Sequence, residues 1–444
     1  MEQSNVLDQP DSQGEPVEVS GQAKGKNYRR YVLFLLTIVY ALNFVDRQIL
    51  VILQESIKVD MALTDAQLGL LTGFAFAIFY VSVGIPIARW ADVGNRKNIV
   101  AGAVAVWSGM TALSGLTQNF YQLLLARIGV GVGEAGGSPP SHSIISDYYP
   151  AKERGRAMSI YSMGVYIGIL IGFVIGGWVN EHYGWRIAFF AVGLPGLLIA
   201  LVVKFTLREP IRGIADGVTV KTKVTVKETL TTLWALKSFR FFALASGLTA
   251  FCSYGIGNFL PSFLIRSHGF ETTQVGISLA ITSGLGGIIG TFAGGYFADK
   301  LGLRDIRWYL WVPAIPAIFG PILIASAMFM ESSTQALTSL FVATVFGALY
   351  LGPVIAITHT LVSPNMRAMS SAILFLVLNL IGLGCGPVAV GLISDALTPS
   401  LGSGVALQYA IAGVSFVGLF SMLAFYRGAK YLPADLASQQ AKAS

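Results

Sequence analysis

The chain has 444 residues, of which 54% are hydrophobic and only 12% carry a charge. Soluble domains carry about 25% charged residues, so this composition excludes an ordinary soluble enzyme, and its apolar richness excludes a disordered chain. The formal net charge of +7 does not indicate nucleic-acid binding, because the basic residues lie between long apolar stretches. The sequence therefore predicts a polytopic membrane protein.

Twelve apolar stretches follow a polar N-terminal segment, each long enough to cross a hydrocarbon core of about 30 Å. In the first half of the chain they cover residues 31–54, 66–91, 98–118, 120–146, 155–180 and 185–207. In the second half they cover residues 240–266, 274–299, 307–329, 334–362, 368–396 and 404–427. We therefore expect an all-α fold with 12 transmembrane helices.

The predicted organisation has five parts. They are a disordered cytoplasmic tail (1–30), an N-terminal six-helix bundle (31–207), a charged cytoplasmic linker (208–238), a C-terminal six-helix bundle (239–430) and a C-terminal cytoplasmic tail (431–444). Of the 30 Lys and Arg residues, 25 lie in segments on the side of both termini and three in segments on the other side. The positive-inside rule then predicts that both termini are cytoplasmic.

Two motifs recur at nearly one period. Asp92 and Asp299 each follow the second apolar stretch of their half, and they lie 207 residues apart. Arg156 and Arg367 each begin an Arg-Ala-Met-Ser run, and they lie 211 residues apart. Self-similarity at a fixed period indicates a repeat-built architecture, so we predict two pseudo-symmetric six-helix bundles.

The repeated loop resembles a known signature. Its first copy is Ala88-Arg-Trp-Ala-Asp92-x-x-Asn95-Arg96-Lys97, and its second copy is Gly295-Tyr-Phe-Ala-Asp299-Lys300-x-Gly302-x-Arg304. Both resemble the Gly-x-x-x-Asp-x-x-Gly-Arg-Lys/Arg signature of the major facilitator superfamily of repeat-built transporters. The first copy departs from that signature at both glycine positions. Its Asn-Arg-Lys ending, together with residues 42–47 and 127–135, resembles the spinster branch.

Four strongly charged residues lie well inside apolar stretches: Asp46, Arg47, Arg127 and Glu134. A charge at the bilayer centre costs at least about 2.5–3.5 kcal/mol, so such residues usually face a cavity or a partner. Arg127 and Glu134 are seven residues apart and share one side of a helix. We interpret Asp46 and Glu134 as proton-coupling groups, and Arg47 and Arg127 as their partners or as ligands of an anionic substrate. The alternative is a permanent structural ion pair.

The second half offers polar side chains instead of charges. Tyr254 and Asn258 lie on one face of the seventh predicted helix, and Thr358 and His359 lie near the end of the tenth. We predict that these four side chains bind substrate. Hydrogen bonding between helices is the alternative.

The superfamily resemblance also implies a cytoplasmic gate. It places Asp92 at the start of the eleventh helix near Arg367, and Asp299 at the start of the fifth helix near Arg154. A carboxylate is stabilised at the positive N-terminus of a helix. Arg96 and Arg304 complete the predicted gate. Their alternative role is to set membrane topology alone.

The spinster resemblance implies a secondary transporter that works by alternating access, draws on the proton gradient and moves a lysophospholipid or sphingolipid-like amphiphile. The alternatives are a proton-coupled symporter of small organic anions such as sugar acids, and a non-transporting membrane receptor. The sequence contains no nucleotide, metal or catalytic motif, so we expect no cofactor, no enzymatic activity and no nucleic-acid partner, and no oligomer is required. Short outer loops without glycosylation sequons favour a bacterial inner membrane.

Overall fold

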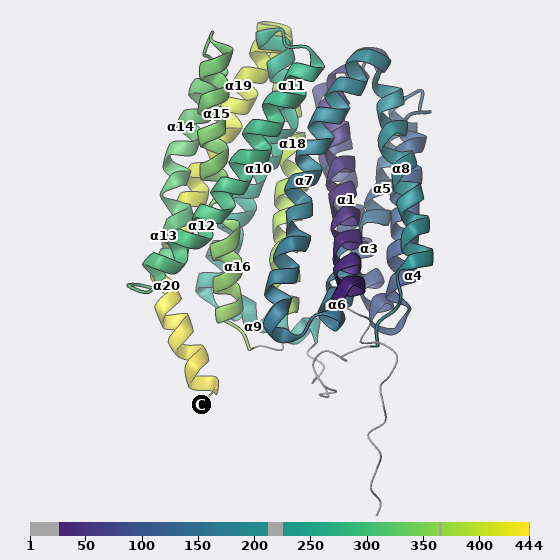
Figure 1. Ribbon diagram of the computed structural model, residues 1–444. Helices are drawn as coiled ribbons and strands as arrows, with labels where there is room; N and C mark the ends of the chain where they lie inside the picture. Colours follow the sequence, from purple (N-terminus) through teal and green to yellow (C-terminus); the bar gives the residue numbers. More distant parts are fainter. Residues whose placement is uncertain (1–25, 212–224, 364–365, 444) are drawn as a thin grey trace, which may run out of the picture.

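The computed structural model describes residues 26–211, 225–363 and 366–443, and the regular structure in these ranges is helical. Figure 1 shows the helices standing side by side in two groups, α1 to α8 and α10 to α20. The first residues of α1 and the C-terminal end of α20 lie at the same end of the molecule. We call this end the terminal face and the opposite end the distal face.

Helices of the first group form six columns. They are α1 (Lys26–Met61), then α2 (Asp65–Gly69), η1 (Leu70–Phe74) and α3 (Ala75–Val93) in one column, α4 (Arg96–Ser114), α5 (Phe120–Glu134) with α6 (Ser138–Tyr148), α7 (Ala151–Tyr183) and α8 (Trp185–Thr206). The break between α5 and α6 precedes Pro139 and Pro140, which fit the first turn of a helix because no intrahelical partner is needed there.

The second group repeats this arrangement after the short helix α9 (Val226–Ala235). Its six columns are α10 (Lys237–His268), then α11 (Thr272–Leu279) with η2 (Ala280–Leu285) and α12 (Gly286–Gly302), α13 (Trp308–Ala314) with α14 (Pro316–Met328), α15 (Ser333–Ala348) with α16 (Leu351–Thr360), α17 (Arg367–Val377) with η4 (Leu378–Cys385) and α18 (Gly386–Leu401), and α19 (Ser403–Ser415) with α20 (Val417–Ala443). The twelve predicted helices are therefore present in the described chain.

Ten of the columns in the described ranges are long and apolar enough to cross a membrane. The break after Glu134 leaves α5 with 15 residues and α6 with 11, which is short for a continuous span. α4 packs against both α5 and α8, so it belongs to the same bundle. The chain is a multi-pass membrane protein built from helices.

The segment boundaries differ from the predicted ones at three places. α1 begins at Lys26, inside the predicted tail 1–30, and the positions before Lys26 lie outside the described part of the chain. The predicted linker 208–238 contains α9, and its positions 212–224 also lie outside that part. α20 continues through the predicted C-terminal tail, where Leu432 is buried.

Backbone irregularities repeat between the two halves. The π-helical segments η1 and η2 begin at Leu70 and Ala280, in corresponding columns and at nearly the separation of the repeated motifs. Gly184 and Gly402 link the fifth column to the sixth in their halves, with φ of 83° and 78°, a conformation that favours glycine. The internal repeat read from the motifs therefore extends to local backbone geometry.

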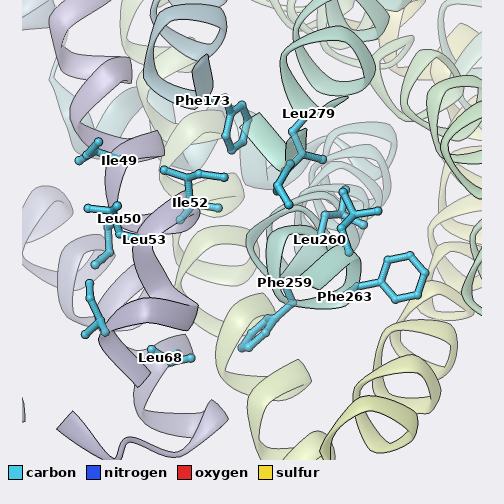
Figure 2. Close-up of a cluster of buried hydrophobic side chains, with 14 of the residues drawn as sticks. Ile49, Leu50, Ile52, Leu53, Leu68, Phe173, Phe259, Leu260, Phe263 and Leu279 are labelled. Atoms are coloured by element: carbon cyan, nitrogen blue, oxygen red, sulfur yellow. The ribbon is translucent and has the colours of Figure 1, made fainter. Parts of the chain in front are cut away.

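Buried apolar side chains from both halves meet in one cluster. Ile49 and Leu53 come from α1, Phe173 from α7, and Phe259 and Phe263 from α10, and all are buried. Figure 2 shows these side chains on neighbouring helices of the two halves. Because this cluster lies in the distal parts of α1, α7 and α10, the two halves are closed against each other there.

Glycines allow α7 to approach α1 closely. Gly164, Gly168, Gly172 and Gly176 all lie against α1, and a methyl group at Gly168 would lie 2.3 Å from the carbonyl oxygen of Ala41. Small residues at this spacing permit tight packing between membrane helices.

Candidate functional site

Two ion pairs join α1 to α5. Arg47 Nε donates to Glu134 Oε2 at 2.8 Å, and the side chain of Glu134 is fully buried. The rings of Phe44, Phe76 and Tyr80 lie 5.1, 4.7 and 5.4 Å from the Arg47 guanidinium carbon. Aromatic faces attract a cation at these distances. Arg47 is thus held by a carboxylate and three rings.

The second pair is looser. Arg127 Nη1 lies 3.6 Å from Asp46 Oδ1, and both side chains are buried. Within the described ranges, Nε and Nη1 of Arg127 have no hydrogen-bond partner, and neither has Oδ2 of Asp46. A buried donor without a partner is costly, so Arg127 carries unused hydrogen-bonding capacity.

Thr111 of α4 is a partner of Asp46 that sequence reasoning missed. Its Oγ1 lies 2.5 Å from Asp46 Oδ1 and 2.9 Å from the carbonyl oxygen of Trp107. A hydroxyl group has one proton to donate, so Thr111 can donate to only one of these two oxygens at a time. No pattern along the chain indicates this contact, because threonine often bonds the carbonyl four residues earlier in its own helix.

A cavity of about 410 Å³ lies between the two halves. Its volume falls within the range of about 300–1,000 Å³ that small-molecule sites usually occupy. The charged side chains that line it are Arg47 and Arg127, both from the first half. The second half contributes mostly apolar, aromatic and small polar side chains. The cavity therefore has a cationic side and a largely apolar remainder.

The predicted substrate ligands divide into two sets. Tyr254 and Asn258 line the cavity, and Asn258 Nδ2 donates to the carbonyl oxygen of Tyr254 at 2.6 Å. Thr358 and His359 do not line it. Thr358 donates to Val354 O at 2.7 Å, and His359 Nε2 lies 2.6 Å from Ser371 Oγ, towards the terminal face. Thr358 and His359 lie at the end of α16, beyond the part of this helix that borders the cavity.

Asp46 and Glu134 also lie outside the cavity lining. They sit behind Arg127 and Arg47, inside the first bundle. Asp46 faces α4 and α8 through Thr111 and Gly196. The charged border of the cavity is therefore formed by the arginines, and the two carboxylates contact it through them.

On the distal face a charged network joins the halves, and sequence reasoning missed it. Arg266 of α10 donates to Glu55 of α1 at 2.9–3.0 Å and to Asp65 of α2 at 2.8 Å. Lys58 and Ser394 also donate to Asp65, at 2.5 and 2.7 Å. Lys58 and Arg266 are two of the three basic residues that the sequence places on the side opposite the termini, and no role was predicted for Asp65.

Arg96 of the predicted gate makes its contacts inside its own half. It is buried, donates to Glu209 Oε1 at 2.6 Å and to Ser143 Oγ at 2.8 Å, and forms an ion pair with Asp147. These contacts hold the start of α4 against α6 and the segment after α8. In this conformation Arg96 does not bridge the two halves.

Three other gate residues also contact residues of their own half. Asp299 accepts a hydrogen bond from Tyr309 at 2.8 Å, Arg154 donates to Ser146 O at 2.9 Å, and Arg367 donates to His359 O at 3.3 Å. Arg304 is exposed. The side chain of Asp92 lies outside the described residues. The cross-half gate on the terminal face stays a prediction for another conformation.

Hydrogen bonds between the halves follow one pattern. In the described chain they lie near the middle of the columns, as between Tyr166 and Thr291 at 2.5 Å, or on the distal face. Gln54, for example, donates to Ser262 Oγ at 2.9 Å near the distal ends of α1 and α10. The distal face is therefore closed. Among the described residues, no cluster of three His, Cys, Asp or Glu side chains is arranged to hold a metal ion.

Comparison with known sequences defines the class of protein. The sequence profile of the Major Facilitator Superfamily matches residues 36–387, so the chain belongs to that superfamily of membrane transporters, which are not enzymes. An MFS-type efflux pump of Mycolicibacterium smegmatis is 33% identical over 392 residues, covering 86% of this chain and 89% of the relative. The probable galactarate/D-glucarate transporter of Bacillus subtilis is 25% identical, covering 69% of this chain and 72% of the relative.

Two further similarities identify the branch of the superfamily to which the chain belongs. Protein spinster homolog 1 of Xenopus laevis is 26% identical over 473 residues, covering 98% of this chain and 89% of the relative. The crystal structure of a bacterial homolog to the human lysosomal transporter spinster, in an inward-facing and unoccupied conformation, superposes with a TM-score of 0.87 at 32% identity. It covers 93% of this chain and 99% of that chain. The chain is a major facilitator transporter of the spinster branch, as its motifs predicted.

Proposed function

We propose that this protein is a proton-coupled secondary transporter that moves a lysophospholipid or sphingolipid-like amphiphile by alternating access. The observation that carries the proposal is the cavity of about 410 Å³, whose charged lining consists of Arg47 and Arg127. An amphiphile with an anionic head and an apolar tail matches that division. The head binds at the arginines, and the tail lies along the second half.

Arg127 is the better head-group ligand of the two arginines. Arg47 already donates to Glu134 at 2.8 Å, whereas Nε and Nη1 of Arg127 have no partner among the described residues. A guanidinium binds phosphate or carboxylate with two parallel hydrogen bonds. Both of these Arg127 nitrogens are buried in this conformation, so an anionic head group reaches them only after Arg127 turns from Asp46 towards the cavity, where Tyr254 and Asn258 lie on the facing side.

Asp46 is the primary proton site in this proposal, and Glu134 is the second titratable group. When Asp46 is ionised, Arg127 is attracted to it and Thr111 donates to Oδ1. When Asp46 is protonated, its O–H group donates a hydrogen bond to Thr111 Oγ1, and the Thr111 hydroxyl donates to the carbonyl oxygen of Trp107. The negative partner of Arg127 is then removed, and the guanidinium is available to the substrate. Proton and anionic head group therefore bind together, which is the thermodynamic basis of coupling.

The proposed orientation places the terminal face in the cytoplasm, because the basic residues between the apolar stretches gather on that side. The closed distal face is then the outer face of a bacterial inner membrane, and the described conformation is inward-facing. When the transporter turns outward, we expect the terminal face to close through Asp92, Arg154, Asp299 and Arg367.

A sugar-acid symporter is the second candidate. The similarity to a probable galactarate/D-glucarate transporter supports it, since two arginines also suit a small dianion. The largely apolar second side of the cavity favours the amphiphile.

Flux in proteoliposomes tests the proposal. A fluorescent lysophospholipid and a labelled galactarate are measured side by side under an imposed pH gradient. Gradient-dependent movement of the lysophospholipid is the expected result. Movement of galactarate alone would favour the sugar-acid symporter, and saturable binding of either ligand without flux would indicate a receptor.

A further inference from the structure

Each half caps a helix of the other half on the distal face. Glu181, in the last turn of α7, accepts a hydrogen bond from the backbone N–H of Thr273 at 2.8 Å, at the start of α11. Asp395, in α18, accepts from the backbone N–H groups of Asp65 and Ala66 at 2.9 and 2.8 Å, at the start of α2. The first N–H groups of a helix have no intrahelical acceptor, so these carboxylates satisfy donors that the helices cannot satisfy themselves.

The two contacts are equivalent under the internal repeat. The step along the chain from Glu181 to Asp395 is close to the step from Ala66 to Thr273, and both are close to the period of the repeated motifs. Ala66 and Thr273 occupy the same second position of their helices. Because the same kind of contact occurs at matching positions in both halves, it is poorly explained as an accidental hydrogen bond.

Glycine contacts repeat in the same way. A methyl group at Gly177 would lie 2.4 Å from Thr272 O, and one at Gly391 would lie 2.3 Å from Asp65 O. Each of these glycines lies four residues before the carboxylate of its own helix, so the two pairs are separated by the same step along the chain. One turn of α7 or α18 therefore supplies both the close approach and the cap.

Each capped helix also has a cap from its own chain. Thr64 Oγ1 accepts from Gln67 N at 3.2 Å, and Glu271 N donates to Gln274 Oε1 at 3.3 Å, each within a capping box. The donors at the start of α2 and α11 are thus shared between a local cap and a carboxylate of the opposite half. Only the second kind of contact depends on how the halves are placed.

We propose that Glu181 and Asp395 form a pair of cross-half caps that hold the distal face closed, and that breaking them is part of opening that face. The pair is unequal. Asp395 accepts from two N–H groups next to the Arg266–Asp65 pair, whereas Glu181 is exposed and accepts from one. Asp395 therefore contributes more to closure than Glu181. This inference uses the alternating access of the proposed function but does not depend on its substrate or on proton coupling.

Cysteine labelling at the closed face tests it. In full-length protein with Cys252 and Cys385 replaced by serine, Ser262→Cys places a thiol in the buried contact with Gln54 of the opposite half. The rate of its reaction with a membrane-impermeant maleimide, measured without substrate or pH gradient, reports the fraction of molecules open at the distal face. Failure of the flux experiment would therefore count against the proposed function alone, and failure of the labelling experiment against this inference alone.

We expect Glu181→Ala to raise the labelling rate roughly five-fold and Asp395→Ala by more, since loss of a helix cap changes an equilibrium by about this factor. The matched controls, Thr64→Ala and Gln274→Ala, each break the capping box of one of the same two helices and should leave the rate within about two-fold of the parent. Asp395→Asn keeps only one of the two acceptor oxygens and should label at a rate between those of the parent and Asp395→Ala. Equal rates in the cross-half variants and their controls would overturn the proposal.

Discussion

Arg127 lies beside Asp46 without hydrogen-bonding to it, since Nη1 and Oδ1 are 3.6 Å apart, while Arg47 donates to Glu134 at 2.8 Å. The two ion pairs therefore have different tasks in the proposed cycle. The tight pair of Arg47 and Glu134 fixes the position of α1 against α5. The loose pair of Arg127 and Asp46 leaves a guanidinium at the cavity that responds to the charge of its neighbour.

Neutralising Asp46 separates coupling from transport. In Asp46→Asn we expect loss of pH-driven accumulation and retention of substrate exchange between equal pools, because the amide imitates a permanently protonated acid. The measurement is exchange and pH-driven flux in the same proteoliposome preparation. pH-driven flux like that of the parent would rule out Asp46 as the proton site.

Thr111 positions that proton site. Thr111→Val keeps the volume but removes the hydroxyl that lies 2.5 Å from Asp46 Oδ1, so Asp46 loses the hydrogen-bond partner of both its ionised and its protonated form. We expect the pH profile of transport to differ from that of the parent. Thr111→Ser retains the hydroxyl and serves as the control, with a profile like that of the parent. An unshifted profile in the valine variant would contradict this role.

Arg127 determines affinity for the anionic head group. A hydrogen bond to a charged group contributes about 1.5–3 kcal/mol, so Arg127→Ala should weaken binding of a lysophospholipid by roughly 10- to 100-fold. Arg186 is a matched control, because its pair with Asp60 at 2.9 Å is partly exposed and lies outside the cavity lining. Binding is measured by displacement of a fluorescent lysophospholipid from detergent-solubilised protein. Equal affinities in Arg127→Ala and Arg186→Ala would exclude the head-group site.

Arg266 stabilises the closed distal face. Arg266→Gln leaves the buried carboxylate of Asp65 without its main partner, and breaking a buried pair costs about 3–5 kcal/mol. We expect a clearly lower thermal midpoint and faster maleimide labelling at the distal face. Arg186→Gln removes an exposed pair, for which about 0–1 kcal/mol is expected. Similar midpoints for the two variants would show that the network contributes little to closure.

The sequence predicted the helices and the internal repeat, but it predicted fewer of the contacts between residues that lie far apart in the chain. The number of helices and the repeat followed from apolar stretches and from motifs that recur at nearly one period, both of which are visible along the chain. The isolation of Asp46, Arg47, Arg127 and Glu134 in apolar surroundings indicated that these charges interact, but it did not indicate which arginine pairs with which carboxylate. Thr358 and His359 were predicted as substrate ligands, yet they lie outside the cavity lining, because the position of a residue along a helix does not specify how far the cavity extends.

Contacts across the distal face were not predictable in this way. Glu55, Asp65 and Arg266 lie near predicted helix ends, where charges are common and are usually solvated. Their roles depend on how the two halves meet, and no local pattern encodes that placement. Glu181 and Asp395 lie about one repeat period apart in the sequence. This spacing indicates a shared role only when the helices that they cap are known.

In the proposed cycle a proton moves together with the amphiphile through the cavity bordered by Arg127, with Asp46 behind it. The most direct test is proton movement driven by substrate alone, with an internal pH dye in proteoliposomes that have no imposed pH gradient. Addition of a lysophospholipid gradient should change the internal pH in the parent and leave it unchanged in Asp46→Asn, although both proteins exchange the lipid. Movement of the lipid by the parent without any change in internal pH would contradict coupling at this site.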